Sequence, residues 1–196
     1  MSASLVGSEM CIRDRYKFIA PALIGILGFS SCSNEENGGF QFPTAESVIG
    51  NYQGTIQTPS TDSTQLNETA ASVGLDSIYI ADMAVDDIIR ILAGDSITDS
   101  ISYPEQVAYT MKYERKINLT FDTVWVATQP DTLRFDYTRG DSTYQIKVVF
   151  DEEKTGAYSI FDRELKLNLQ ANKLIINEDT VQTFHSIPYQ ILLNKQ

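Results

Sequence analysis

The residues able to carry out chemistry are few in this chain, and their spacing does not suit catalysis. The 196 residues include one histidine, His185, and two cysteines, Cys11 and Cys32. Nucleophilic catalysis needs a Ser, Thr or Cys beside a base that a third group orients, and no GxSxG segment accompanies His185. One histidine cannot form a His cluster for zinc, and no DxDxDG loop is present for calcium. We therefore expect no catalytic residue and no metal site, and His185 as a surface or interface residue.

Phosphate-binding loops are also absent from the sequence. Gly38 and Gly39 lie in a polar N-terminal segment, and no GxGxxG or GxxxxGK segment follows an expected strand. We therefore expect no cofactor.

Carboxylates are the one abundant reactive group, because 26 acidic side chains outnumber 15 basic ones. Two carboxylates at a suitable separation can hydrolyse a glycosidic bond, which keeps a glycan-acting hydrolase as an alternative function. The densest group, Asp151, Glu152 and Glu153, falls in the segment DEEKTG, which we expect to be a hairpin loop with solvated charges. The formal charge of -11 repels nucleic-acid phosphates, so we expect no nucleic-acid partner.

The N-terminal region predicts where in the cell the protein is located. Residues 1–15 (MSASLVGSEMCIRDR) have no hydrophobic period and resemble a translated sequencing adaptor, so they are excluded from the fold. Residues 16–31 contain Lys17, the apolar run 18–29 and two serines, which is the pattern of a signal peptide. The apolar run is too short for a mature membrane-spanning helix, which takes about 20 residues.

Cys32 directly follows the two serines, and this arrangement resembles the lipobox of bacterial lipoproteins, with Phe29 in place of the usual leucine. The resemblance implies cleavage before Cys32 and lipidation of its thiol. The anchor would be stable because each buried acyl CH2 contributes about 0.8 kcal/mol and several chains act together. The alternative is an ordinary secretory signal followed by an incidental cysteine.

Residues 32–43 then form the lipidated cysteine and a polar, glycine-containing tether. Glu35 and Glu36 resemble the acidic signal that sends Bacteroidetes lipoproteins to the outer face of the outer membrane; a merely solvated tether would have the same composition. We expect an outer-membrane lipoprotein that is surface-exposed rather than periplasmic. Removal of residues 1–31 takes away three basic and two acidic side chains and changes the charge from -11 to -12. No cysteine remains beyond the anchor, so the domain must be stable without disulfides.

Residues 44–196 are expected to form a single β-rich domain. Apolar and polar residues alternate in several segments, as in strands with one buried face. Strands are also expected at 51–58 and 75–81, a polar loop or edge hairpin at 60–74, and a turn or bulge near Asp122, where the apolar parity changes. A short helical turn at 44–49 would begin with Thr44 as its N-cap. The alternating apolar positions are Val107, Tyr109, Met111, Tyr113; Leu133, Phe135, Tyr137; Tyr144, Ile146, Val148, Phe150; Leu165, Leu167, Leu169; Ile187, Tyr189, Ile191 and Leu193.

One amphipathic helix is expected at about 83–93, because Val85, Ile88, Ile89 and Leu92 fall on one face. Asp82 is expected to cap its start, and its apolar face to cover an open end or edge of a sheet. The fold class is therefore mainly β: an antiparallel β-barrel or sandwich of about seven to nine strands with one amphipathic helix.

Three features together resemble the family called domain of unknown function 4840 of Bacteroides lipoproteins. They are the YxGT start at Tyr52, Gly54 and Thr55, the segment IYIADMAVDDIIRIL at 78–92, and long alternating strands that end in LLNKQ. The resemblance covers residues 44–196. It implies a location in the cell envelope and a β-rich fold, but no catalytic residue. The start is also similar to that of calycin-like β-barrels, whose first strand carries a comparable glycine.

Two further motifs could mark interaction or modification. Arg139, Gly140 and Asp141 spell RGD and resemble an integrin-recognition motif, although a hairpin turn needs a glycine at this point. Asp followed by Ser or Thr and a methyl-bearing residue occurs eight times and resembles the Bacteroidetes O-glycosylation sequon; turns before apolar strands would produce the same pattern. The acceptor positions are Ser63, Ser77, Ser96, Ser100, Thr123, Thr132, Ser142 and Thr180.

We therefore expect a lipid-anchored envelope protein whose β domain binds a ligand or partner without catalysis. The alternatives are a glycan-acting hydrolase and a structural accessory subunit of an envelope complex. The expected partners are the membrane, through the lipid anchor, and a glycan, a lipid or an envelope protein. A ligand site inside a barrel would require spare volume between its inward side chains.

Overall fold

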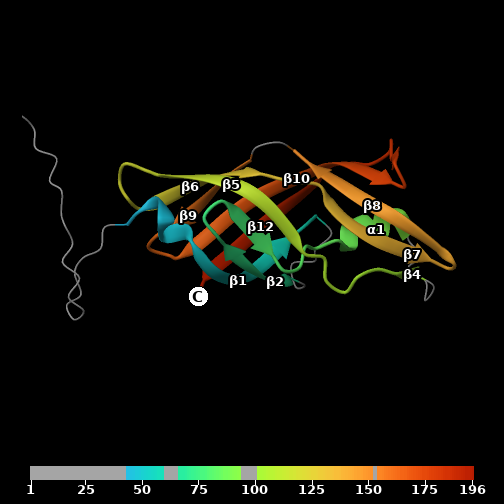
Figure 1. Cartoon of the computed structure of the whole chain (residues 1–196), viewed down its shortest axis with the longest axis horizontal. Coiled ribbons are helices and arrows are strands. Elements are labelled where there is room, and N and C mark those ends of the chain that lie inside the picture. Colours follow the sequence, from blue (N-terminus) through green and yellow to red (C-terminus); the bar gives the residue numbers. More distant parts are fainter. Residues whose placement is uncertain (1–42, 60–65, 94–100, 152–153) are drawn as a thin grey trace, which may run out of the picture. The chain divides into compact units, whose positions relative to one another are not determined.

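The computed structural model describes residues 43–59, 66–93, 101–151 and 154–196, which all lie in the compact unit Phe40–Gln196 (Figure 1). Strands make up most of it, as the sequence predicts. The elements are η1 (Ala45–Val48), β1 (Gly50–Gln57), β2 (Asn67–Val73), β3 (Ser77–Ile80), α1 (Asp86–Ala93), β4 (Ile101–Ser102), β5 (Tyr109–Ile117), β6 (Thr123–Gln129), β7 (Leu133–Arg139), β8 (Ser142–Phe150), β9 (Lys154–Ser159), β10 (Glu164–Ile176), β11 (Asp179–Thr180) and β12 (Ile187–Lys195).

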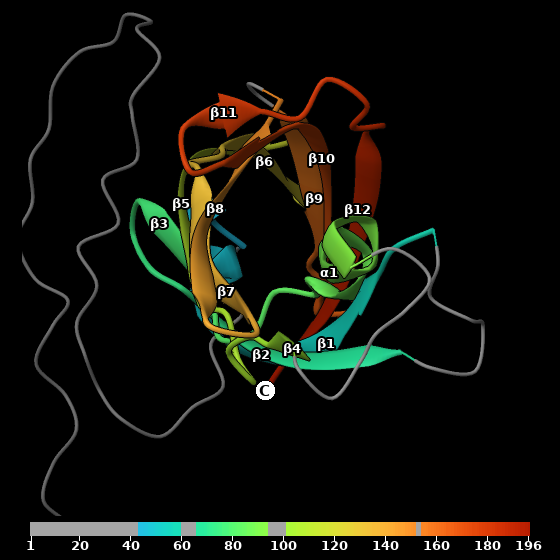
Figure 2. The same ribbon diagram turned by 90° about the vertical axis from the view of Figure 1, so that its right-hand side faces the viewer.

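Eight of the strands form a closed antiparallel β-barrel. They follow the order β12-β1-β2-β3-β5-β6-β9-β10, and pairing of β10 with β12 closes the ring. Figure 2 looks down the axis of this barrel, so that the strands are seen as a ring. The fold class is confirmed, and between the two architectures that the sequence left open, the structure is a barrel.

The four additional strands extend the sheet beyond the barrel from the second half of β10. Residues 164–166 of β10 pair with β9, and residues 171–176 pair with β8, so β8 and β9 lie in line along one edge of β10. β7 pairs with β8, while the two-residue strands β4 and β11 pair with β7 and β10.

This arrangement corrects the expectation of a hairpin loop at Asp151. The backbone N–H of Asp151 donates to the carbonyl of Gln170 at 2.9 Å, so the chain keeps its direction along β10 from β8 to β9. A register shift between Ala171 and Lys173 of β10 marks the same place. The acidic segment is therefore an interruption within one line of strands; Glu152 and Glu153 themselves lie outside the described residues.

The alternating apolar residues fill the inside of the barrel and of its extension. With the exception of half-buried Tyr144, every alternating position that the sequence predicts is buried. Side chains of the core expose at most 8% of their surface, and Tyr52, Ile56 and Tyr189 expose 1% or less. Apolar burial of this kind is the main stabilising term for a domain without disulfides.

The sequence predicts a loop or an edge hairpin at residues 60–74, but residues 67–73 form strand β2 within the barrel wall. Thr69, Ala71 and Val73 do alternate on its buried face, but these side chains are small and give a weak hydrophobic signal. Its pairing with β1 on one side and β3 on the other makes it a full barrel strand.

Helix α1 confirms the expected amphipathic helix, and its buried Ile88 and Ile89 belong to the core. The figures place α1 at the end of the barrel opposite η1 (Figures 1 and 2). The expected capping by Asp82 is wrong: the helix begins four residues later, and the Asp82 carboxylate accepts the backbone N–H of Val107 at 3.0 Å. The tertiary bond to Val107 has replaced a local cap.

The opposite end is closed by η1. The Thr44 hydroxyl accepts the N–H of Glu46 at 3.2 Å, which confirms the expected cap, and Val48 is fully buried. The Tyr52 hydroxyl donates to the carbonyl of Val48, and the Lys195 ammonium donates to that of Ser47 at 2.7 Å. These bonds tie the start of the domain to both β1 and β12.

Gly54 of the YxGT segment allows β1 to approach β12 closely. A Cβ at this position would lie 1.9 Å from the carbonyl oxygen of Leu192, which is backbone and cannot move aside. Glycine inside a strand often marks such a bend or close approach in a barrel.

We predict that Gly54→Ala lowers the free energy of unfolding by about 1–3 kcal/mol, as overpacking does in well-packed interiors. Urea denaturation followed by fluorescence measures this change. Gly74→Ala is the matched control, because a Cβ there meets only Ser77 at 3.6 Å or more, and its effect should stay within about 1 kcal/mol. Equal effects for the two variants would contradict the close-approach argument.

Candidate functional site

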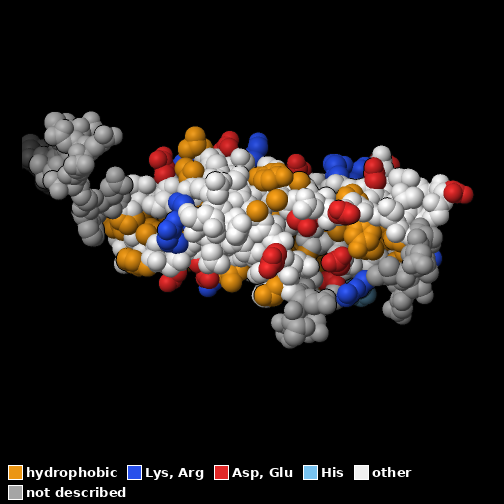
Figure 3. Space-filling model, turned by 90° about the horizontal axis from the view of Figure 1, so that it is seen from below, with side chains coloured by type: hydrophobic (Ala, Val, Ile, Leu, Met, Phe, Trp, Pro, Cys, Tyr) orange, Lys and Arg blue, Asp and Glu red, His pale blue; other side chains and the backbone are white. Residues whose placement is uncertain are grey.

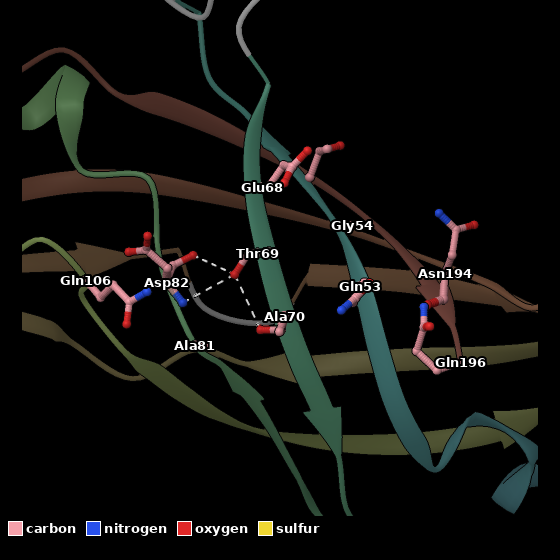
Figure 4. A pocket seen from close by; sticks show the side chains of 11 residues that line it. Gln53, Gly54, Glu68, Thr69, Ala70, Ala81, Asp82, Gln106, Asn194 and Gln196 are labelled. Carbon is pink, nitrogen blue, oxygen red and sulfur yellow. Dashed lines mark hydrogen bonds between the residues drawn. The ribbon is translucent and has the colours of Figure 1, made fainter.

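The outer wall of the barrel carries a hollow of about 580 Å³ beside β1, β2 and β12. Its side chains come from three barrel strands, the segments on either side of α1, and the C-terminus (Figure 4). We call it the amide groove. It is lined by Gln53, Gly54, Thr55, Glu68, Thr69, Ala70, Ala81, Asp82, Gln106, Asn194 and Gln196.

The groove exists because β3 is short. The last bond along this edge of β2 joins the N–H of Ala81 to the carbonyl of Ala70 at 2.8 Å, and the chain then leaves the sheet. The Thr69 hydroxyl holds the departing segment: it donates to the Asp82 carbonyl at 2.8 Å and accepts the Asp82 N–H at 3.2 Å. The first residues of β2 therefore border an open groove instead of another strand.

The chemistry of the groove is that of hydrogen bonding. Four primary amides, two hydroxyls and two carboxylates line it, and none of its lining residues is aromatic. Each amide offers two N–H donors and a carbonyl acceptor, so the groove can match a ligand that has many hydroxyl groups. Stacking against sugar rings is not available within the groove itself.

The two carboxylates of the groove are not arranged as an evident catalytic pair. Asp82 already accepts the N–H of Val107, which links it to the backbone after α1. Glu68 is exposed on the outer face of β2. Exposure and backbone bonding suit binding and structural roles better than the proton transfer that glycoside hydrolysis requires.

A second polar feature lies inside the domain, next to α1. The hydroxyls of Tyr137 and Tyr189 are buried and have no hydrogen-bond partner among the described residues. Burial raises the pKa of Tyr189, and the nearby carboxylates of Asp87 and Asp86 add to this shift. Phe150 packs against Tyr189 with ring centroids 5.7 Å apart, so the surroundings are aromatic. The Tyr189 hydroxyl is therefore an uncharged polar group within the core, close to the start of α1.

Two other hollows lie on the described surface. One, of about 680 Å³, lies between η1, Leu75 and Arg115; the other, of about 300 Å³, lies on the outer face of β7 and β8 around Arg134 and Lys147. Neither combines as many hydrogen-bonding side chains from separate strands as the amide groove.

The predicted modification sites divide between described and undescribed residues. Cys32, Ser63, Ser96 and Ser100 lie outside the described residues. The others stand at strand starts or turns: Ser77 begins β3, Thr123 begins β6, Ser142 begins β8, Thr132 precedes β7 and Thr180 ends β11. Of these, Ser142 and Thr180 are exposed, and the others are half-buried. Lipidation and glycosylation stay predictions.

The RGD tripeptide forms the turn between β7 and β8, as turn chemistry predicts. Arg139 pairs with Ser142, and Gly140 has a φ of 58°. A positive φ at the first central residue is typical of a type II′ hairpin. All three RGD residues are exposed, and adhesion stays a prediction.

His185 is exposed in the segment before β12. The described residues contain no group of three or more His, Cys, Asp or Glu side chains placed to hold a metal. They also contain no helix long and apolar enough to cross a membrane.

Sequence reasoning missed the amide groove. Its residues on β1, β2 and β12, such as Gln53, Glu68 and Asn194, occupy the polar positions of the alternating pattern and look like ordinary solvated side chains. The missing signal was the pairing of β1 with both β2 and β12. Once this strand order is known, the outward-facing positions of β1, β2 and β12 are seen to lie side by side on one wall of the barrel.

The fold and the groove define a closed antiparallel β-barrel protein with an extended sheet, a helix at one end and a polar groove on its outer wall. The chain belongs to the family described as Domain of unknown function (DUF4840), whose family model matches residues 47–176. No curated protein and no solved structure matches the chain. The family is the one that the YxGT start and the strand and helix at 78–92 resemble; the Bacteroides and calycin-like resemblances stay predictions.

We predict that Thr69→Val lowers the free energy of unfolding by about 1–3 kcal/mol, because it leaves the backbone N–H and carbonyl of Asp82 without their partner. Thermal unfolding and amide exchange at Asp82 measure the effect. Thr110→Val, at an exposed position of β5, is the control and should change stability by less than about 0.5 kcal/mol. Unchanged exchange at Asp82 would show that Thr69 does not hold the groove wall.

Proposed function

We propose that this chain is a lipid-anchored protein of the bacterial cell envelope whose barrel binds a hydroxyl-rich ligand, such as a glycan, in the amide groove. The proposed role is binding without catalysis. The observation that carries it is the contrast between the filled barrel interior and the polar groove on its outer wall.

The interior supports an external site. Side chains such as Tyr52, Leu167 and Tyr189 occupy the centre of the barrel and expose 1% of their surface or less. An apolar ligand would have to displace these side chains, and interiors at this packing density have little room to rearrange.

The groove supports a polar ligand. Gln53, Asn194 and Gln196 reach it from one side, while Gln106 and Asp82 reach it from the other (Figure 4). A single hydrogen bond adds only about 0.5–1.5 kcal/mol, so useful affinity needs several bonds along an extended ligand. A chain of sugar units provides hydroxyls at repeated intervals.

The proposed location in the cell envelope rests on the N-terminal sequence. The signal-peptide pattern at 16–31 and the lipobox-like placement of Cys32 support export and lipidation. The acidic tether supports display on the outer surface. An acidic, disulfide-free domain is soluble in that compartment.

We predict that residues 33–196 bind one or more glycans on an array, and that the double variant Gln53→Ala/Asn194→Ala weakens the strongest interaction about tenfold, because two or more hydrogen bonds are lost. Isothermal titration with the selected glycan measures the change.

The matched control is Gln190→Ala, which removes an exposed amide from the same strand as Asn194 but outside the groove. Its affinity should equal that of the unmodified domain. Failure to bind any glycan would contradict the proposal, and cleavage of a bound glycan that Glu68→Gln abolishes would show a hydrolase instead.

We predict separately that the protein made in its native host begins at Cys32 and carries acyl chains on it. Intact-mass measurement reports both features, and added hexoses in the same spectrum would reveal O-glycosylation. Proteolysis of intact cells tests surface display. Cys32→Ala should remain unacylated; a soluble secreted wild-type protein with a free Cys32 would contradict lipid anchoring.

A further inference from the structure

Three turns at the η1 end of the barrel expose large apolar side chains. Leu75 lies in the β2–β3 turn, Leu119 and Phe121 in the β5–β6 turn, and Phe161 in the β9–β10 turn; they expose 68%, 97%, 49% and 81% of their surface. We call these four residues the apolar rim. Figure 3 shows hydrophobic side chains at this end of the molecule, and others along the rest of the same face.

Hydrogen bonds and an ion pair connect these turns to their neighbours at this end of the barrel. The Arg115 guanidinium donates to the carbonyl of Leu75 and also approaches Glu46 of η1 at 3.8 Å. The N–H of Ile160 donates to the carbonyl of Asp122 at 2.9 Å, which joins the β9–β10 turn to the β5–β6 turn. Arg115 lies on β5, two residues before that strand ends, so all three turns of the apolar rim lie at the same end of the barrel.

In the β5–β6 turn the polar side chains bond to one another, and the apolar side chains stay exposed. The amide of Asn118 donates to Thr120 at 2.7 Å and to Asp122 at 2.6 Å, and the Thr120 hydroxyl donates to Asp122 at 2.8 Å. Phe121 has a φ of 57°, which is unfavourable for a bulky residue. The turn keeps Leu119 and Phe121 in water despite this strain, and core packing does not explain why.

The same construction recurs in the β9–β10 turn. The Ser159 hydroxyl donates to Asp162 at 2.6 Å, Arg163 has a φ of 57°, and Phe161 stands between these residues with most of its surface exposed. Both turns present rigid apolar tips, so little conformational entropy would be lost when they are buried.

Trp125 and Lys116 lie further along strands β6 and β5, away from these apolar tips. They are direct cross-strand partners on β6 and β5, both are exposed, and Trp125 is two residues beyond the start of β6, about 7 Å along the strand. Apolar tips followed by tryptophan and lysine match the order of the hydrocarbon, headgroup and water layers of a bilayer.

The N-terminal chain enters at this same end. The described residues begin at Pro43, next to η1, and the segment between Cys32 and Pro43 can span at most about 40 Å. An acyl anchor on Cys32 would therefore keep the apolar rim close to the bilayer. The acidic charge of the chain favours a zwitterionic surface over an anionic one.

We propose that the apolar rim inserts into the headgroup region of a zwitterionic bilayer, so that the barrel stands on the membrane on its η1 end. The orientation rests on the proposed lipidation of Cys32, while insertion itself depends only on the rim. The lipid surface is thus a second attachment site, in addition to the acyl chains.

The test couples residues 32–196 through Cys32, the single thiol of this segment, to a maleimide lipid in phosphatidylcholine vesicles. The core lies between Val48 and Leu193, so this segment contains the whole folded unit. Trp125 is the single tryptophan and reports the rim directly. Its emission should move to shorter wavelength on coupling and be quenched by lipids brominated near the headgroup.

The double variant Leu119→Ser/Phe161→Ser should reverse both changes and lower vesicle binding of the uncoupled domain about tenfold or more, since two large apolar side chains no longer enter the bilayer. Leu66→Ser is the matched control: Leu66 is exposed just before β2, at the opposite end of the barrel, and it should leave emission and binding unchanged. Circular dichroism verifies that all variants fold.

Emission of the coupled protein identical to that of the protein without vesicles, with no quenching by brominated lipids, would overturn the proposal, as would shielding of the rim only when a second protein is added. Because the chemical link replaces the acyl chains, this result does not depend on natural lipidation of Cys32. Failure of rim insertion and failure of lipid anchoring are therefore distinguishable.

Discussion

Closure of the sheet between β10 and β12 is the constraint on which the rest of the structure depends. Eight consecutive pairings run from Glu164 with Asn194 to Ala171 with Ile187, and they place Leu165, Leu167 and Leu169 opposite Leu193, Ile191 and Tyr189. These pairs are buried, so closing the ring and filling its interior are one event. A closed ring also removes the free edges that make open sheets prone to aggregation. A filled interior leaves the outer wall as the surface open to the proposed ligand.

The length of β10 explains why one barrel carries an extended sheet. The first half of this strand belongs to the ring, and the second half pairs with β8 after the register shift at Ala171. Aromatic contacts, such as Tyr109 with Phe150 at 5.3 Å, continue the core from the barrel into the extension. The helix α1 covers this region with Ile88 and Ile89. The two ends of the barrel are therefore chemically different: one is capped by a helix over an aromatic core, and the other by the short η1 and turns with exposed apolar tips.

The strands were predictable from sequence wherever large apolar residues alternate, as at Leu165, Leu167 and Leu169. Prediction failed where the inward residues are small, as in β2, and where a long-range bond outcompetes a local one, as when Asp82 binds Val107 instead of capping α1. The groove could not be predicted, because Gln53 and Asn194 are distant in sequence and become neighbours only through the pairing of β1 with β12. The apolar tips Leu119 and Phe161 were missed for the opposite reason: an apolar residue in a turn is indistinguishable in sequence from one that folds inward.

The two proposed surfaces are compatible because of where they lie on the barrel. The amide groove runs along the outer wall beside β1 and β2, and it reaches the C-terminal Gln196, whose N–H donates to the carbonyl of Asn51 at 2.9 Å. The apolar rim lies on turns at the end of the barrel, and none of its residues lines the groove. In the proposed orientation the barrel axis points away from the membrane, so the groove stays in water beside the lipid surface. Asp82 and Gln106, which lie toward the α1 end, would then be further from the lipid than Asn194 and Gln196. A long polar ligand could occupy the groove without displacing the protein from the bilayer, whereas a ligand entering through a barrel end would have to compete with η1 or α1.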